Sequence, residues 1–191
     1  NEGSTFSQNY TLDTTASTTA IDSATLSADT GSSGSDFNTK TAAQTVSGTM
    51  SAALTIGETV YVSLDNGSTW TAAATTVGQN TWSLQGQALT ASNILQVKVT
   101  DLAGNDGTVY SQAYVYDTTA PTTPTVTLAS DTGASSSDGI TNNNQINVTL
   151  SSDTTQWKYS VDSGTTWTTG SGSSFTLTAG AYAANAIQVM A

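Results

Sequence analysis

Two copies of one pattern lie about 100 residues apart in this sequence, and this repeat limits the possible folds more than any other feature. The strongest match is Ser-x-Asp-x-Gly-x-Thr-Trp, which ends at Trp70 in the first copy and at Trp167 in the second. Three further pairs of segments match: 93–97 with 185–189, 29–36 with 131–138, and 13–16 with 117–120. The spacing varies slightly, as expected when strands are kept and loops differ in length. A unit of this length has the size of a small β-sandwich.

Short runs of alternating hydrophobic and polar residues between these segments predict β-strands. The hydrophobic positions in three such runs are Val60, Val62 and Leu64; Leu95, Val97 and Val99; and Ile146, Val148 and Leu150. Alternation with a period of two places one set of side chains on the buried face of a sheet. Asp, Asn, Ser and Gly at 65–67 and 162–164 predict tight hairpin turns, because these residues favour turn conformations. No segment predicts a helix, so the expected fold is all-β.

The order of the motifs resembles bacterial immunoglobulin-like repeats of large surface adhesins and biofilm-associated proteins. The resemblance rests on Asp117-Thr-Thr-Ala-Pro121, on the 131–142 segment, on the Asp-x-Gly-x-Thr-Trp hairpin and on Asp101-Leu-Ala-Gly-Asn105. It implies tandem immunoglobulin-like β-sandwiches that serve as extracellular stalks at a bacterial cell surface. It also implies Ca²⁺ at domain junctions and no catalysis. The first copy departs from the pattern, since Ser17 replaces the linker proline and Phe37 replaces a glycine.

The domain boundaries follow from the repeat. We expect a complete immunoglobulin-like domain at 17–119 and an incomplete one at 120–191 that lacks its last strand. Residues 1–13 align without a gap to residues 105–117, which form the last strand of the complete domain. The segment 1–16 is therefore expected to be the final strand of another sandwich, followed by a linker.

Two explanations account for this arrangement. The chain is either a piece of a longer tandem array, or a subunit whose N-terminal strand completes the open second domain of a neighbouring copy. In the second case Phe6, Tyr10 and Leu12 fall on one face of the donated strand and form the subunit interface. A head-to-tail contact that does not close would generate a filament. The expected partners are thus copies of this chain or flanking repeats.

The charge of the chain excludes several partners and reactions. The net charge is −11, with three lysines as the only basic side chains, which disfavours binding to nucleic acid or to an anionic membrane. No stretch is long and apolar enough to insert into a membrane. The sequence contains no His and no Cys, so a Ser-His-Asp or Cys-His site is impossible. The aspartates recur at repeated turn positions, where a catalytic pair is not expected, and we predict that the chain is not an enzyme.

The aspartates are better candidates for Ca²⁺ ligands, because Ca²⁺ takes carboxylate, carbonyl and water oxygens in flexible geometry. Asp131 and Asp138 bracket a Gly/Ser loop, and Asp101 and Asp117 are expected near the same junction between the two domains. Their counterparts in the first copy are Asp13, Asp29 and Asp36. The simpler interpretation is that these aspartates only form Asx turns.

A ligand-binding, lectin-like adhesin module is the alternative function, because tryptophan faces can stack on sugars. Trp70, Trp167 and Trp82 occupy repeated positions and are expected to pack in hairpins or cores, whereas Trp157 aligns with Val60 and is the candidate for exposure. Both copies follow one template without a long inserted loop, which favours a stalk over a binding tip.

Overall fold

The computed structural model describes residues 2–31 and 33–191, so Asn1 and Ser32, which belong to the segments 1–16 and 29–36, lie outside the described residues. The described part is all-β, as predicted, with no helix and therefore none that could cross a membrane. The strands are β1 (Ile21–Leu26), β2 (Asn38–Thr39), β3 (Ala43–Met50), β4 (Thr59–Ser63), β5 (Thr71–Ala72), β6 (Ala74–Thr75), β7 (Thr81–Ala88), β8 (Asn93–Thr100), β9 (Tyr110–Tyr116), β10 (Thr125–Leu128), β11 (Gln145–Thr149), β12 (Lys158–Ser160), β13 (Thr168–Thr169), β14 (Ser174–Thr176) and β15 (Gln188–Met190).

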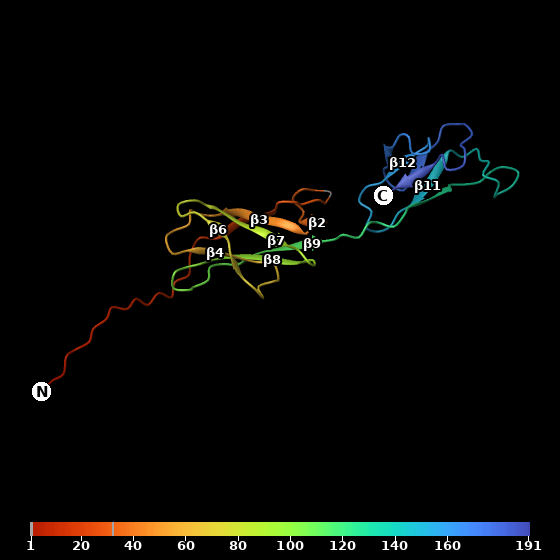
Figure 1. Ribbon diagram of the computed structural model, residues 1–191. Helices are drawn as coiled ribbons and strands as arrows, with labels where there is room; N and C mark the ends of the chain where they lie inside the picture. The colour runs from red at the N-terminus through yellow and green to blue at the C-terminus, as the bar shows by residue number, and fades with distance from the viewer. Residues whose placement is uncertain (1, 32) are drawn as a thin grey trace. The chain divides into compact units, whose positions relative to one another are not determined.

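The chain divides into two compact units, with the division between Thr118 and Thr119 (Figure 1). In the first unit, one sheet has the strand order β1-β3-β7-β6 and the other has the order β2-β9-β8-β4-β5. All neighbouring strands are antiparallel except β2 and β9, which are parallel. Side chains from both sheets share one core, so the unit is a β-sandwich-like body.

The period-two pattern explains why these strands bury one face. In β8 the side chains of Leu95, Val97 and Val99 are fully buried, and the residues between them are only partly buried. Val60 and Val62 in β4 pair with Val99 and Val97 in the neighbouring strand. Such pairs of β-branched side chains on one face stabilise the sheet.

The second unit repeats part of this arrangement with fewer strands. Its sheets have the orders β10-β11-β14 and β13-β12-β15, and the second of these matches β5-β4-β8 of the first unit. The fully packed core is small and comprises Ile146, Val148, Trp157 and Phe175. In the described part of the chain, no strand pairs with the outer edge of β15, which is the edge that β9 occupies on β8 in the first unit.

The expectation that Trp157 is exposed is wrong, because its side chain is only 5% exposed. The indole packs against Tyr159 and Phe175, with ring centroids 6.0 and 6.2 Å away, and its Nε1–H donates to the carbonyl of Gly172 at 3.0 Å. Gly170 makes room for the ring, since a Cβ there would lie 2.2 Å from it. An aromatic cluster therefore fills the space that smaller valines fill in the first unit.

Candidate functional site

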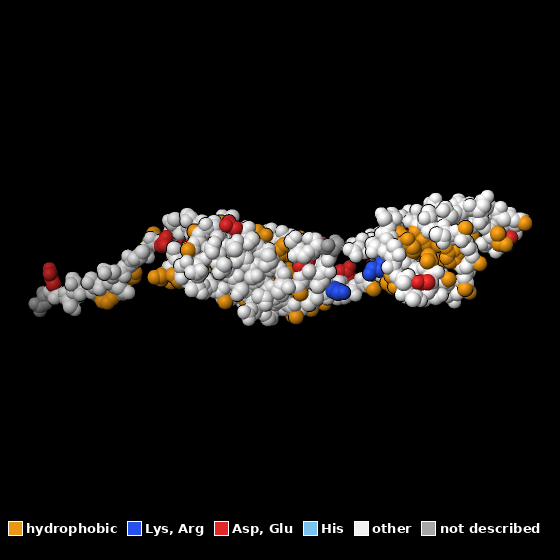
Figure 2. All heavy atoms as spheres, turned by 90° about the horizontal axis from the view of Figure 1, so that it is seen from above, with side chains coloured by type: hydrophobic (Ala, Val, Ile, Leu, Met, Phe, Trp, Pro, Cys, Tyr) orange, Lys and Arg blue, Asp and Glu red, His pale blue; other side chains and the backbone are white. Residues whose placement is uncertain are grey.

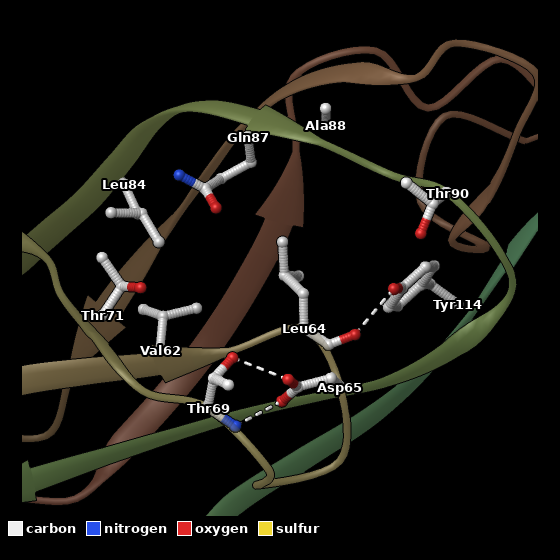
Figure 3. Close-up of a pocket in the computed structure, with 10 residues that line it drawn as sticks. All are labelled: Val62, Leu64, Asp65, Thr69, Thr71, Leu84, Gln87, Ala88, Thr90 and Tyr114. Carbon is white, nitrogen blue, oxygen red and sulfur yellow. Dashed lines mark hydrogen bonds between the residues drawn. The ribbon is translucent and has the colours of Figure 1, made fainter.

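The hairpin between β4 and β5 is held together by Asp65 (Figure 3). Its carboxylate accepts hydrogen bonds from Thr69 N–H at 2.8 Å, from Thr69 Oγ1 at 2.6 Å and from Ser63 Oγ at 2.7 Å. Ser63 Oγ in turn accepts the N–H of Gly67 at 2.8 Å. Gly67 has a φ of 84°, which glycine adopts without strain. The aspartate thus organises the turn, as the sequence pattern predicts.

The second unit contains the same network around Asp162. The Asp162 carboxylate accepts hydrogen bonds from Thr166 N–H at 2.8 Å, from Thr166 Oγ1 at 2.7 Å and from Ser160 Oγ at 2.7 Å. Gly164 also has a φ of 84° and donates its N–H to Ser160 Oγ at 2.8 Å. Agreement of these contacts within about 0.1 Å in the two units indicates that the hairpin is a repeated structural element.

The two hairpin aspartates make the stability of both units depend on acid pH. The hydroxyl of Thr69 lowers the pKa of Asp65, and the backbone N–H of Thr166 lowers the pKa of Asp162, each from 3.8 to about 2. Because the folded state binds the proton less readily, the stabilisation is complete above pH 3.8 and is lost as the pH falls through about 2. We expect melting temperatures to decrease over this range, with a weaker dependence in the double variant Asp65→Asn, Asp162→Asn. Equal pH dependence of the variant and the parent chain would contradict this assignment.

The Asp29–Asp36 loop lies between β1 and β2. Asp29 Oδ2 accepts the N–H of Phe37 at 2.9 Å, and Asp36 Oδ1 accepts the N–H of Asn38 at 3.0 Å. The bond from Asn38 is the main cause that lowers the pKa of Asp36, and the side chain of Asp29 contributes to the same shift. Asp29 Oδ1 is buried without a hydrogen-bond partner among the described residues. Buried polar atoms are normally hydrogen-bonded, so the lack of a partner at this oxygen calls for an explanation.

The corresponding loop of the second unit repeats this geometry. Asp131 Oδ2 accepts the N–H of Gly139 at 2.9 Å, and Asp138 Oδ1 accepts the N–H of Ile140 at 3.0 Å. Asp131 Oδ1 is again buried with no partner in the described part of the protein. Gly139 has a φ of 75°, and Phe37 at the matching position has a φ of 60°. The backbone is therefore kept even where the glycine of the pattern is absent.

Asp101 organises the loop between β8 and β9. Its Oδ1 accepts the N–H groups of Ala103 at 2.9 Å and Asn105 at 2.8 Å, and its Oδ2 accepts Asn105 Nδ2 at 2.9 Å. These contacts, led by the Asn105 side chain, lower the pKa of Asp101. Asn105 Nδ2 also donates to the carbonyl of Asp13 at 3.1 Å, which brings the N-terminal linker to this loop.

The prediction that Asp101 and Asp117 lie near the same junction is wrong. Strands β8 and β9 are antiparallel, so Asp101 follows the far end of β8 while Asp117 follows the end of β9 that lies next to Ser92. The eight residues of β8 separate the two positions by roughly 26 Å at 3.3 Å per residue. Asp117 donates its N–H to the carbonyl of Thr39 at 3.0 Å and so shares its end of the unit with the Asp29–Asp36 loop.

These positions allow a test of the predicted Ca²⁺ ligands. Among the described residues, no group of three or more acidic, His or Cys side chains is arranged to hold a metal. Two loops nevertheless each contain two aspartates and leave one carboxylate oxygen buried without a hydrogen-bond partner among the described residues, at Asp29 and at Asp131; in the first loop the side chains of Asp29 and Asp36 interact. A Ca²⁺ ion would supply that missing contact and would take its remaining ligands from backbone carbonyls and water. These two loops fit the ion, whereas the carboxylate of Asp101 is already used by its own loop.

Strand β9 shows what closes a complete unit. Tyr114 is buried, and its hydroxyl donates to the carbonyl of Leu64 at 2.8 Å (Figure 3). Tyr110, Gln112 and Tyr116 are partly buried on the same face, while Ser111, Ala113 and Val115 face outward. The hollow beside Tyr114 has a volume of about 160 Å³, less than the several hundred Å³ of ordinary ligand pockets. This face therefore serves packing.

The N-terminal segment contains the predicted interface residues, and its described residues pair with no strand in the part of the chain that the structure describes. Phe6, Tyr10 and Leu12 are 85%, 83% and 90% exposed, and every described residue from 2 to 12 is exposed. The carbonyl of Asp13 at the end of the segment accepts a hydrogen bond from Asn105 Nδ2 at 3.1 Å. Three large hydrophobic side chains on one short exposed segment are the composition of an interface strand.

Sequence reasoning missed Glu58, which anchors the linker at the same end as Asp13. Ser17 Oγ donates to Glu58 Oε1, and Thr55 N–H donates to Glu58 Oε2 at 2.8 Å. Burial raises the pKa of Glu58, but the hydrogen bonds from Ser17 and Thr55 together outweigh it, so the net effect is to lower the pKa. The signal was weak, because a single Glu three residues after Thr55 does not recur in the second copy.

No protein-family model matches the chain, and no curated protein matches its sequence.

Proposed function

We propose that this chain is a structural, non-enzymatic part of an extracellular stalk or filament at a bacterial cell surface, built from tandem immunoglobulin-like sandwiches. The observation that supports it most is the path of the chain through the first unit. The chain enters beside the β8–β9 loop, where Asp13 binds Asn105, and leaves at Asp117 beyond the opposite end of the strands. A unit with this path transmits tension along its strands, which suits a repeated mechanical element.

Immunoglobulin-like tandem architecture is supported by the shared strand order and the duplicated hairpin. The sheet order β13-β12-β15 repeats β5-β4-β8, and the Asp65 network recurs at Asp162. In the first unit β9 lies next to β8, so this sheet continues beyond the β4–β8 pair, as in a two-sheet sandwich. Duplication of loops and turns favours a structural role over catalysis, because an enzyme needs one specialised site.

The charge supports the proposed partners. A net charge of −11 repels nucleic acid and anionic lipid surfaces, and it attracts divalent cations. We propose copies of this chain or flanking repeats as the macromolecular partners. The lectin-like alternative would require a pocket or an exposed aromatic platform, which the buried Trp82 and Trp157 cannot provide. Trp70 and Trp167 are partly buried; Lys98 lies over the Trp70 ring at 4.3 Å, and Trp167 donates its Nε1–H to the carbonyl of Gly164 at 3.0 Å.

A mechanical measurement tests this function directly. In single-molecule stretching between residues 17 and 119, the first unit should unfold in one event with a force peak. A fully extended chain of this length spans about 330–370 Å at 3.3–3.6 Å per residue, so the released length, after subtracting a few tens of Å for the folded unit, should be roughly 300 Å. A glycan screen on the same protein should show no binding. Smooth extension without a peak, or saturable binding of a glycan, would contradict the structural role.

Ca²⁺ is the proposed cofactor, held by Asp29 and Asp36 in the first unit and by Asp131 and Asp138 in the second. When bound, the ion would neutralise the paired carboxylates and satisfy the buried oxygens of Asp29 and Asp131. The aspartates themselves position the loop through the N–H groups of Phe37 and Gly139. Asp13 and Asp117 would contribute to binding only at the ends of the unit where they lie, whereas the carboxylate of Asp101 is engaged by Ala103 and Asn105.

Chelation should lower the stability of both units. At a free Ca²⁺ concentration 100-fold above the dissociation constant, binding stabilises the folded state by about 2.7 kcal/mol. For units of this size this corresponds to a decrease of roughly 10 °C or more in melting temperature on adding chelator. The variant Asp29→Asn should remove the response of the first unit and leave that of the second, and Asp131→Asn should do the reverse. Unchanged melting curves after chelation would show that the loops do not bind Ca²⁺.

A further inference from the structure

The second unit leaves hydrophobic side chains uncovered at positions that are buried in the first. Ile187 and Val189 correspond to Leu95 and Val97, which are fully buried, yet they are only partly buried. Figure 2 shows hydrophobic side chains gathered on an exposed face of this unit. In the first unit β9 pairs with the edge of β8 and adds Tyr114 to the core beside Leu95 and Val97, whereas among the described residues no strand pairs with this edge of β15.

The N-terminal segment has the side-chain pattern that this position requires. The inward-facing residues of β9 are Tyr110, Gln112, Tyr114 and Tyr116, and the residues aligned with them are Phe6, Gln8, Tyr10 and Leu12. The outward-facing positions of β9 align with Ser7, Asn9 and Thr11, which are all polar. In both segments a glutamine, Gln112 or Gln8, stands between two inward-facing aromatic residues. The two segments therefore share more than the alternation of apolar and polar residues that any strand at a sheet surface would show.

We infer that residues 5–12 of one copy of this chain pair with β15 of a second copy and complete its second unit. The inference extends the structural role proposed above, because it names the partner and the contact, and it does not require bound Ca²⁺. The open edge of β15 presents backbone N–H and C=O groups for such pairing, and the uncovered face accepts alternate side chains. We take a second copy as the occupant, because its residues 6, 8, 10 and 12 match the inward-facing residues of β9; closure within one copy is an outcome of the test below.

The register of the contact follows from the first unit. In the β8–β9 pair, Tyr110 lies opposite Val97 and Tyr114 lies opposite Asn93. The same register places Phe6 opposite Val189 in β15. Gln8 and Tyr10 would lie opposite Ile187 and Asn185, which precede β15, so this segment, in which Asn185 has a φ of 65°, has to become extended when the strand binds. Tyr114 donates its hydroxyl to the carbonyl of Leu64, so Tyr10 should donate to the carbonyl of Val161 in the second copy.

The other edge of the donated strand also has a partner in this register. Strand β2 pairs in parallel with β9, with Asn38 opposite Val115 and Thr39 opposite Tyr116. The aligned residues in the second unit are Ile140 and Thr141, which would lie beside Thr11 and Leu12. Each copy then donates one strand and accepts one, so the contact is heterologous and propagates into a chain of subunits.

The contact can be tested with a labelled peptide and a chain that lacks its own donor. Residues 1–12 are deleted, which leaves the contacts of the first unit intact because the described residues 2–12 are all exposed. A fluorescent peptide of residues 1–13 is then titrated with this protein in the presence of chelator. We expect saturable binding with one peptide for each chain. No saturable binding would overturn the inference, and it would leave the stretching result for the first unit unaffected.

Matched peptides distinguish strand insertion from non-specific adhesion. The peptide with Tyr10→Asp should bind about 100-fold more weakly or worse, because it places a charge in an apolar groove. The peptide with Asn9→Asp carries the same added charge on the outward face and should bind within about threefold of the parent. Equal weakening by both substitutions would overturn the proposed register.

The intact chain decides whether the strand is exchanged between copies. In sedimentation at increasing concentration, the 191-residue chain should form progressively larger oligomers, and the deletion variant should remain monomeric. Oligomers formed by the deletion variant would assign assembly to another surface. A monomer at all concentrations with the N-terminal strand protected from hydrogen exchange would mean closure within one copy, and would overturn exchange between copies.

Discussion

Joining a second copy of residues 100–117 after Ala191 should raise the melting temperature of the second unit by roughly 20 °C or more. These residues follow Val99, which aligns with Ala191, so the added strand enters the sheet next to β15 in the register of β9. Covering a few hundred Å² of apolar surface stabilises by about 5 kcal/mol at 25 cal/mol per Å². For a unit of this size, each kcal/mol shifts the melting temperature by about 4–8 °C.

Scanning calorimetry measures this change, because the two units should unfold in separate transitions. The matched control carries the same extension with Tyr110→Ser and Tyr114→Ser in the added copy only, and it should recover little of the gain. The extended chain should also stop forming oligomers, since its own strand occupies the edge. An unchanged low-temperature transition in the extended chain would mean that the second unit is not a sandwich awaiting this strand.

The second large effect concerns two equivalent positions with different burial. Leu95 is 0% exposed, so Leu95→Ala should cost about 3–5 kcal/mol of unfolding free energy in the first unit. Ile187 at the matching position is only partly buried, so Ile187→Ala should cost less than about half as much in the second unit. The reason is that a truncation at an uncovered edge leaves a smaller cavity than one in a closed core.

Chemical denaturation with a probe for each unit measures both costs in the chain that lacks residues 1–12, where no donor strand is present. In the chain extended with residues 100–117, the cost of Ile187→Ala should rise toward that of Leu95→Ala, because the added strand buries the position. The Leu95→Ala cost should not change with the extension. Equal costs at the two positions before the extension would contradict the difference in closure between the units.

The repeat and the hydrophobic alternation predicted the all-β fold and the hairpins, because these features depend on local sequence. Asp65 and Asp162 occupy tight turns in both units, as their neighbours Ser63 and Gly67 indicate. These contacts span only a few residues. Local chemistry therefore suffices to place them.

The incorrect expectations concern contacts between distant segments. Exposure of Trp157 could not be judged from its alignment with Val60, because the ring fills space left by Gly170 and packs on Phe175. The grouping of Asp101 with Asp117 failed because the direction of β9 relative to β8 separates loops that are close in sequence. The buried unpartnered oxygen of Asp29 likewise depends on how its loop folds over residues 37–38.

Negative-stain electron microscopy of the 191-residue chain in chelator tests the central claim most directly. If residues 5–12 of each copy complete the second unit of the next, the images should show filaments of uniform width that lengthen with protein concentration. The chain without residues 1–12 should give single particles under the same conditions. Single particles of the intact chain at every concentration would contradict a structural filament assembled by strand donation.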